Sequence, residues 1–191
     1  MLKYLVPRIA LTDLPSIIGF AVFGAILAGI YGILHDQVTY SIGPEYFTKL
    51  KFKQFGFADF GLGNRIFVSF VGFLATWWAG FFVAWFLSRR LIPKQQRSTA
   101  FRKILAGFTI VFACGFAAGL GGYCYGIWRG PKADFTAWQS VFSQYDITDS
   151  WAFVRVAYIH NASYLGGLFG FLVALYFIRP EDESVISDKA T

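Results

Sequence analysis

The side chains best suited to chemistry are the two histidines of this chain and the acids near the first of them. His35 is followed directly by Asp36 and soon afterwards by Glu45, whereas His160 lies far away in the sequence. Imidazole nitrogens and carboxylate oxygens are ligands for zinc, manganese and iron, so these four residues are candidate metal ligands. They have no local ligand spacing such as H-E-x-x-H. The fold would therefore have to bring them together.

Polar residues beside these candidates would support such a site. Gln37 and Tyr46 accompany the first histidine, and Asn161 and Tyr164 accompany the second. If a site forms, we expect these four side chains to stand behind its ligands. No residue is assigned a catalytic role at this stage.

Four long apolar runs must position these residues. They cover about residues 14–34, 66–87, 104–127 and 156–178, and a helix needs about 20 apolar residues to cross a hydrocarbon core. Hydrophobic residues make up 56% of the 191 residues and charged residues 15%, against about a quarter charged in a soluble domain. The sequence predicts an all-α membrane protein, a single domain over 1–191 that folds as a four-transmembrane-helix bundle.

The segment between the second and third runs orients the chain. Residues 88–103 contain no acid and six basic residues: Arg89, Arg90, Lys94, Arg97, Arg102 and Lys103. Short loops rich in Lys and Arg stay in the cytoplasm. We therefore expect both termini, including a tail over 179–191, on the cytoplasmic side. The loops 35–65 and 128–155 are then outside.

This orientation places both histidines at the outer end of the bundle. The first run ends at Leu34, so His35 is expected just beyond the first helix. Asp149 or Ser150 is a good N-cap for the fourth helix, which puts His160 about 13 Å along that helix, near the outer interface. We therefore expect the two histidines to approach each other.

The membrane interior offers few charges for transport. Residues 15–34, 66–87 and 104–127 contain no Asp, Glu, Lys, Arg or His, and only His160 enters the fourth run. Ion-coupled carriers usually place acids or histidines near the midplane. The pattern argues against an ion-coupled transporter and against a pore lined by charge.

Small residues predict how the helices pack. The first run has Ala21, Ala25 and Gly29 at a spacing of four, and the third and fourth runs have similar rows. Small residues at this spacing let helices approach closely in lipid. The second run instead carries a stripe of Phe and Trp. We expect helices 1, 3 and 4 to pack tightly and helix 2 to be peripheral.

The first outer loop is predicted to contain a short interfacial helix. Pro44 and Glu45 suit the start of a helix, and the stretch from Tyr46 to Phe57 mixes aromatic residues with lysines. The expected anchors at the membrane interface are Phe47, Lys49, Lys51 and Phe52. The alternation in 49–53 would also suit a strand. Basic and aromatic residues together can bind nucleic acid, but the outer location excludes such a partner.

Two strings resemble signatures of a protein family. The string from His35 to Phe52 has the pattern HDQxTYxxxPEYFTKxKF, and the string from His160 to Gly167 has the pattern HNxSYLGG. Both are similar to an uncharacterised family of bacterial four-span inner-membrane proteins. The resemblance implies a location in the bacterial inner membrane, and it implies no activity or substrate.

Three interpretations of the polar cluster stay open. In the first, His35, Asp36, Glu45 and His160 satisfy one another and fasten the outer loop over the bundle. In the second, they hold a transition metal such as zinc, manganese or iron. In the third, His35 and His160 ligate a b-type haem, with Arg129 or Arg155 near its propionates.

Our first expectation is a non-catalytic role. The chain would be a structural or accessory subunit, surrounded by membrane lipids, whose aromatic second helix and outer cap meet a partner membrane protein or a second copy of the chain. The competing expectation is a metal- or haem-dependent activity at the periplasmic face. A third is a carrier of a neutral or lipid-like molecule.

Overall fold

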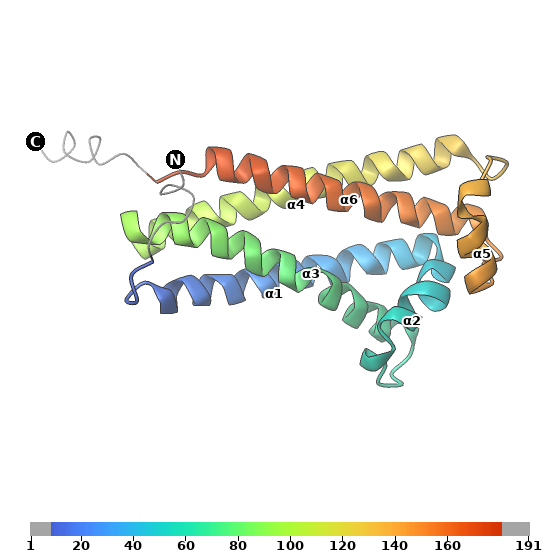
Figure 1. The fold of residues 1–191 in the computed structure, drawn as a ribbon, viewed down its shortest axis with the longest axis horizontal. Coiled ribbons are helices and arrows are strands. Elements are labelled where there is room, and N and C mark those ends of the chain that lie inside the picture. Colours follow the sequence, from blue (N-terminus) through green and yellow to red (C-terminus); the bar gives the residue numbers. More distant parts are fainter. Residues whose placement is uncertain (1–8, 181–191) are drawn as a thin grey trace, which may run out of the picture.

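The protein is a bundle of four long helices. The computed structural model describes residues 9–180, within which there are helices and no strands. The long helices are α1 (Leu14–Ile42), α3 (Asn64–Leu91), α4 (Arg97–Arg129) and α6 (Ser150–Phe177) (Figure 1). Each is long and apolar enough to cross a membrane. The predicted all-α four-helix membrane fold is confirmed.

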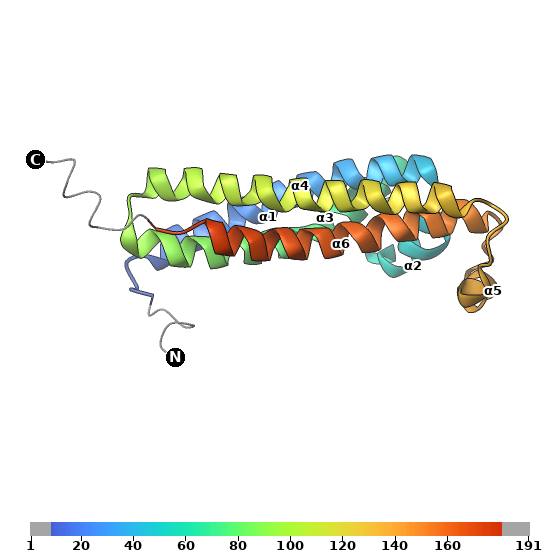
Figure 2. The same cartoon turned by 90° about the horizontal axis from the view of Figure 1, so that it is seen from above.

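The helices form two antiparallel pairs, α1 with α3 and α4 with α6 (Figures 1 and 2). The described chain begins and ends at one end of the bundle. The opposite end carries the short helices α2 (Phe52–Gln54) and α5 (Gln139–Tyr145). We call this opposite end the outer end. Of the tail predicted over 179–191, residues 181–191 lie outside the described part of the chain.

The prediction that the second helix is peripheral is wrong. Its residues Gly72 and Gly80 pack against the backbone of Gly32 and Gly24 in α1, so closely that a Cβ at any of these positions would collide with the facing carbonyl oxygen. Between these two contacts, the hydroxyl of Thr76 donates a hydrogen bond to a carbonyl oxygen of α1 (2.8 Å). Two glycines separated by two helical turns interrupt the aromatic stripe on one face, and that face packs on α1.

The predicted tight packing of the third and fourth long helices is confirmed. A Cβ at Gly122 would meet the carbonyl oxygen of Tyr158, and one at Gly166 would meet that of Cys114. The aromatic stripe of α3 lies on the outside of the bundle, where its exposed members are Phe70, Trp77, Trp78, Phe82 and Phe86. These rings face whatever surrounds the bundle, lipid included.

Helix α1 is longer than predicted. It does not end at Leu34 but continues for two further turns to Ile42, so His35 lies within the helix. Nothing in this stretch breaks a helix until Gly43 and Pro44, and proline disfavours helical geometry in the residue before it. Helix α6 begins as predicted, because the carboxylate of Asp149 accepts a hydrogen bond from the backbone of Ala152 (3.0 Å).

The outer segment after α1 is helical, and its start at Pro44 is confirmed. A π-helical turn over Tyr46–Lys51 leads into α2. The segment caps the bundle. Phe47 is fully buried, and the ring of Phe52 stacks on Phe67 of α3 (centroids 4.2 Å apart). The prediction that Phe47 is an anchor at the membrane interface is wrong, because its ring packs inside the protein, whereas Phe52 is half-buried and its role as an anchor stays a prediction.

Candidate metal centre

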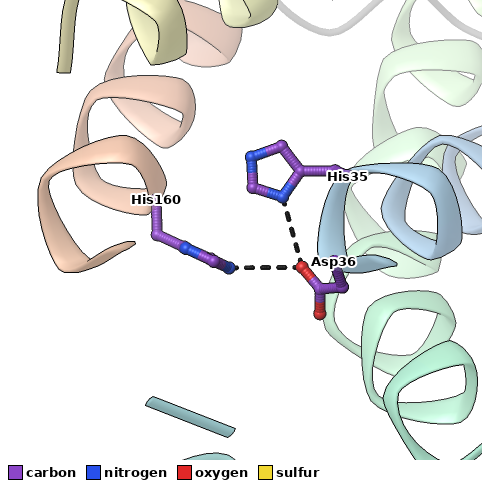
Figure 3. A group of neighbouring side chains, drawn as sticks. All are labelled: His35, Asp36 and His160. Atoms are coloured by element: carbon purple, nitrogen blue, oxygen red, sulfur yellow. Dashed lines mark hydrogen bonds and ion pairs between the residues drawn. The ribbon is translucent and has the colours of Figure 1, made fainter. Parts of the chain in front are cut away.

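Three of the four candidate ligands come together at the outer end. Figure 3 shows His35 and Asp36 extending from α1 and His160 from α6, with both imidazole rings directed at the same carboxylate oxygen. Oδ1 of Asp36 lies 3.2 Å from Nδ1 of His35 and 3.2 Å from Nε2 of His160. The two rings are nearly perpendicular, with centroids 4.8 Å apart. The expected approach of the two histidines is confirmed.

The cluster is largely removed from solvent. Asp36 and His160 retain 5% and 1% of their exposure, and a buried charge needs partners. The hydroxyl of Thr39, one turn after His35 in α1, donates to the carbonyl oxygens of His35 (3.1 Å) and Asp36 (3.3 Å). This contact fixes the backbone that presents both ligands.

The hydrogen bonds of His160 determine which nitrogen carries its proton. Nδ1 lies 3.0 Å from the carbonyl oxygen of Val156, and a carbonyl oxygen only accepts, so Nδ1 is the donor. Nε2 of the neutral ring then presents a lone pair toward the carboxylate of Asp36. Two acceptors bind each other only when a cation, either a proton or a metal ion, lies between them.

His35 repeats this arrangement. Its Nε2 lies 3.4 Å from the hydroxyl of Ser163 on α6, and its Nδ1 faces Asp36. A hydroxyl accepts as readily as it donates, so His35 can carry its proton on Nε2 and then direct the lone pair of Nδ1 at the carboxylate. Metal-bound histidines typically hydrogen-bond a carbonyl, carboxylate or water through the nitrogen away from the metal. Both histidines have such an outward partner.

Two of the three distances between the donor atoms suit one small ion. One atom from each of His35, Asp36 and His160 lies within 4.8 Å of the other two. Two ligands that each lie about 2.0–2.2 Å from a zinc ion are separated by no more than about 4 Å, and by less in tetrahedral geometry. The two nitrogen–oxygen separations of 3.2 Å meet this condition, whereas the widest separation in the group, 4.8 Å, exceeds it, so the histidines must come closer together when an ion binds.

Aromatic rings enclose the cluster on the α6 side. The ring of Tyr46 lies 4.8 Å from that of His160, and the ring of Tyr164 lies 6.0 Å from it. Both tyrosines were predicted as supporting residues, and both lie beside His160. Burial, with help from the charges of Tyr164 and Asp36, raises the pKa of Tyr46 above the usual tyrosine value. Its phenol therefore stays neutral beside the cluster.

Glu45 is not part of this cluster, so its prediction as a ligand is wrong. Its carboxylate accepts hydrogen bonds from the backbone nitrogens of Thr148 (2.8 Å) and Asp149 (2.9 Å), just before α6 begins. Desolvation opposes ionisation, but the bonds from Thr148 and Asp149, together with the charge of Lys49, hold the pKa of Glu45 below its usual value. Glu45 ties the outer segment to the start of α6.

Two predicted supporting residues also point elsewhere. The amide of Gln37 donates to the carbonyl oxygen of Arg65 (2.7 Å) and to the hydroxyl of Ser69 (2.9 Å) on α3. Asn161 is exposed on α6, because it follows His160 by one residue and so points about 100° away around the helix. The supporting groups that the sequence did not reveal are Val156, Ser163 and Thr39. Each stands three or four positions from a histidine in the sequence, and this helical spacing could have identified them.

A b-type haem does not fit these histidines. Bis-histidine ligation places the two rings on opposite sides of the macrocycle. Here both rings contact one oxygen of Asp36, and their centroids are 4.8 Å apart. The space between them holds a carboxylate and could not hold a macrocycle. Of the arginines considered for the propionates, Arg155 donates to the carbonyl oxygen of Ile42 (3.3 Å) and Arg129 to that of Asp134 (2.6 Å).

The cluster lies at one end of a cavity of about 760 Å³ inside the bundle. His35, Asp36, Lys51, Ser163 and Tyr164 line its polar end. All four long helices contribute to the rest of the wall, mostly through apolar side chains and glycines. The site therefore faces a largely apolar cavity that a ligand could occupy.

Neither known protein families, nor curated proteins, nor solved structures show a match to this chain. The family suggested by the two sequence strings stays a prediction.

Proposed function

We propose that this chain is a metal-binding protein of the bacterial inner membrane, with one divalent ion held by His35, Asp36 and His160. The observation that carries the proposal is the arrangement of hydrogen-bonding groups. One nitrogen of each histidine faces the same carboxylate, while their other nitrogens face Val156 and Ser163. The basic segment 88–103 supports an orientation with the termini in the cytoplasm and the metal site at the periplasmic face.

The donor set favours zinc or iron(II). Two histidines and a carboxylate bind catalytic zinc, and the same set forms the facial triad of non-haem iron proteins. Structural zinc sites usually have four protein ligands, whereas catalytic sites have three and keep a position open. Three ligands beside a cavity correspond to the second kind. When bound, the ion would supply Lewis acidity to a molecule in the cavity.

Metal content distinguishes this proposal from the interpretation in which the cluster only holds the outer loop over the bundle. The full-length protein, purified in mild detergent without chelator or histidine tag, is expected to retain about one equivalent of metal, measured by elemental mass spectrometry. His160→Ala should lose it. Asp36→Asn is the sharper variant, because its amide can donate to a histidine lone pair and preserve the fold while it removes the anionic ligand.

Glu45→Gln is the matched control. It changes a carboxylate at the same end of the bundle that does not face the cluster, so its metal content should equal that of the wild type. If the wild type binds neither zinc nor iron after incubation with each, or if Asp36→Asn retains the metal in full, the proposal fails. The cluster would then hold α1 and α6 together through hydrogen bonds, with a proton rather than a metal ion between its groups.

The exposed aromatic face of α3 favours a second candidate function, that of an accessory subunit. Phe70 and Trp77 belong to this face and do not line the cavity. A partner bound here would give a complex larger than one chain in mild detergent, and Phe70→Ala combined with Trp77→Ala would dissociate it. The metal content should not change. A monomer in both cases would exclude this candidate.

A further inference from the structure

The cavity is nearly as long as the hydrocarbon part of one membrane leaflet is thick. Its lining runs from Ala28 to Asp36 on α1 and from Ser163 to Phe171 on α6, each about 12 Å along a helix. Half of a hydrocarbon core measures about 15 Å. The polar end lies near the outer end of the bundle, so the apolar end reaches toward the membrane midplane. A lipid chain of the outer leaflet occupies the same depth.

The cavity opens to the side between α3 and α6. Three residues line the cavity and are also about half exposed on the bundle surface: Trp78 and Phe82 on α3 and Leu168 on α6. Toward the opposite end the two helices close, where the guanidinium of Arg90 donates to the carbonyl oxygen of Leu175 (2.5 Å). A hydrocarbon chain could enter from the membrane without crossing water.

A half-buried lysine marks the polar end. Lys51 lines the cavity, lies 5.7 Å from the ring centroid of Tyr46 and makes no ion pair with any residue in the described part of the chain. Burial lowers the pKa of Lys51, although the negative charge of Asp36 opposes this shift. With a divalent ion on the cluster, the charges of ion, Asp36 and Lys51 sum to a positive value. The polar end would then attract an anion.

The cavity wall also contains an unsatisfied hydroxyl. Tyr31 lies one turn before His35 on α1, and its buried hydroxyl has no hydrogen-bond partner among residues 9–180. A buried polar group without a partner is costly. A ligand with a polar atom just below its head group would satisfy this hydroxyl.

We infer that the cavity binds an amphiphile with one hydrocarbon chain and an anionic head, the chain between the helix pairs and the head beside Lys51. The volume of about 760 Å³ lies within the range of about 300–1,000 Å³ typical of small-molecule sites. The inference deepens the proposed function, since the head would face the open position of the metal. Fatty carboxylates and single-chain lipid phosphates share this chemistry.

Four probes with the same oleoyl chain test the head group: oleate, oleoyl lysophosphatidate, oleoyl lysophosphatidylcholine and monoolein. Binding to the full-length protein is measured by native mass spectrometry. We expect the two anionic probes to bind at least about tenfold more tightly than the other two. The stronger of the two identifies a carboxylate or a phosphate as the preferred head. Equal binding of monoolein and the anionic probes would overturn the inference.

Two pairs of variants test the location. At both Gly167 and Gly121 an added Cβ meets no atom within 4 Å, but only Gly167 lines the cavity. Gly167→Leu should weaken all probes by about tenfold or more, and Gly121→Leu should not. Lys51→Gln should abolish the preference for anionic probes, whereas Lys53→Gln, at an exposed lysine over Tyr145, should retain it.

Metal content measured on the same samples keeps the two proposals distinguishable. Gly167→Leu should retain the metal of the wild type, which also shows that the bundle is intact. If no metal binds but the selectivity that depends on Lys51 persists, the metal proposal fails and the lipid site stands. If Gly167→Leu binds every probe as the wild type does, the cavity is not the binding site and the inference fails.

Discussion

The hydrogen-bond partners of the outward nitrogens of His35 and His160 orient the two rings. Val156 and Ser163 both belong to α6, so one helix provides a ligand and orients both rings. This arrangement lowers the cost of binding a metal, because both rings are already oriented toward Asp36 before the ion arrives.

Removal of the hydroxyl behind His35 should therefore weaken metal binding without removing a ligand. We expect Ser163→Ala to lower the metal affinity by about 10–100-fold, measured by competition with a chelating indicator. Ser69→Ala is the control, since Ser69 accepts from Gln37 and lies away from the cluster. Unchanged affinity in Ser163→Ala would show that this hydroxyl does not orient His35.

Glu45 makes the outer cap sensitive to acid. A carboxyl group whose pKa is lowered by folding stabilises the protein above its unfolded pKa, near 4.5, and this contribution is lost as the pH falls through the lower folded value. We expect Glu45→Gln to reduce stability at neutral pH by about 0.3–1 kcal/mol. In thermal unfolding the difference from the wild type should shrink below about pH 4. A difference independent of pH would contradict this role.

Residue types predicted the site better than sequence proximity did. His35, Asp36 and His160 were identified because histidines and acids are rare near the membrane-spanning runs. The three errors, Glu45, Gln37 and Asn161, arose from neighbourhood in the sequence. A helix turns successive residues by about 100°, and a carboxylate near a helix start prefers the free N–H groups there.

At the scale of the helices, the close contact of α1 and α3 sets the width of the bundle. A Cβ at Gly72 would collide with the backbone of Gly32. We expect Gly72→Ala to destabilise the protein by about 1–3 kcal/mol, measured by thermal unfolding in detergent. Gly19→Ala is the matched control in α1, because its Cβ meets nothing within 4 Å. Equal unfolding temperatures for the two variants would exclude a tight contact.

The helices themselves were largely predictable, and their pairing was not. Long apolar runs identify membrane helices because lipid demands about 20 apolar residues for each crossing. The extension of α1 through His35 to Ile42 was missed because hydropathy falls there while nothing breaks the helix. The contact between α1 and α3 was missed because Gly72 and Gly80 stand eight positions apart among large aromatic residues.

For the molecule as a whole, the basic segment 88–103 predicts which end faces the cytoplasm. In a background without Cys114 and Cys124, a cysteine at exposed Ser140 on α5 should react in intact cells with a thiol reagent that cannot cross membranes. A cysteine at exposed Ser98, at the other end of the bundle, should react only after permeabilisation. The reverse pattern would place the metal site in the cytoplasm.

X-ray absorption spectroscopy of the zinc-loaded protein tests whether His35, Asp36 and His160 bind one metal ion. We expect nitrogen and oxygen neighbours at about 2.0–2.2 Å, the outer-shell scattering of two imidazole rings, and loss of one ring in His160→Ala. Neighbours with no imidazole scattering, or a spectrum unchanged in His160→Ala, would contradict it.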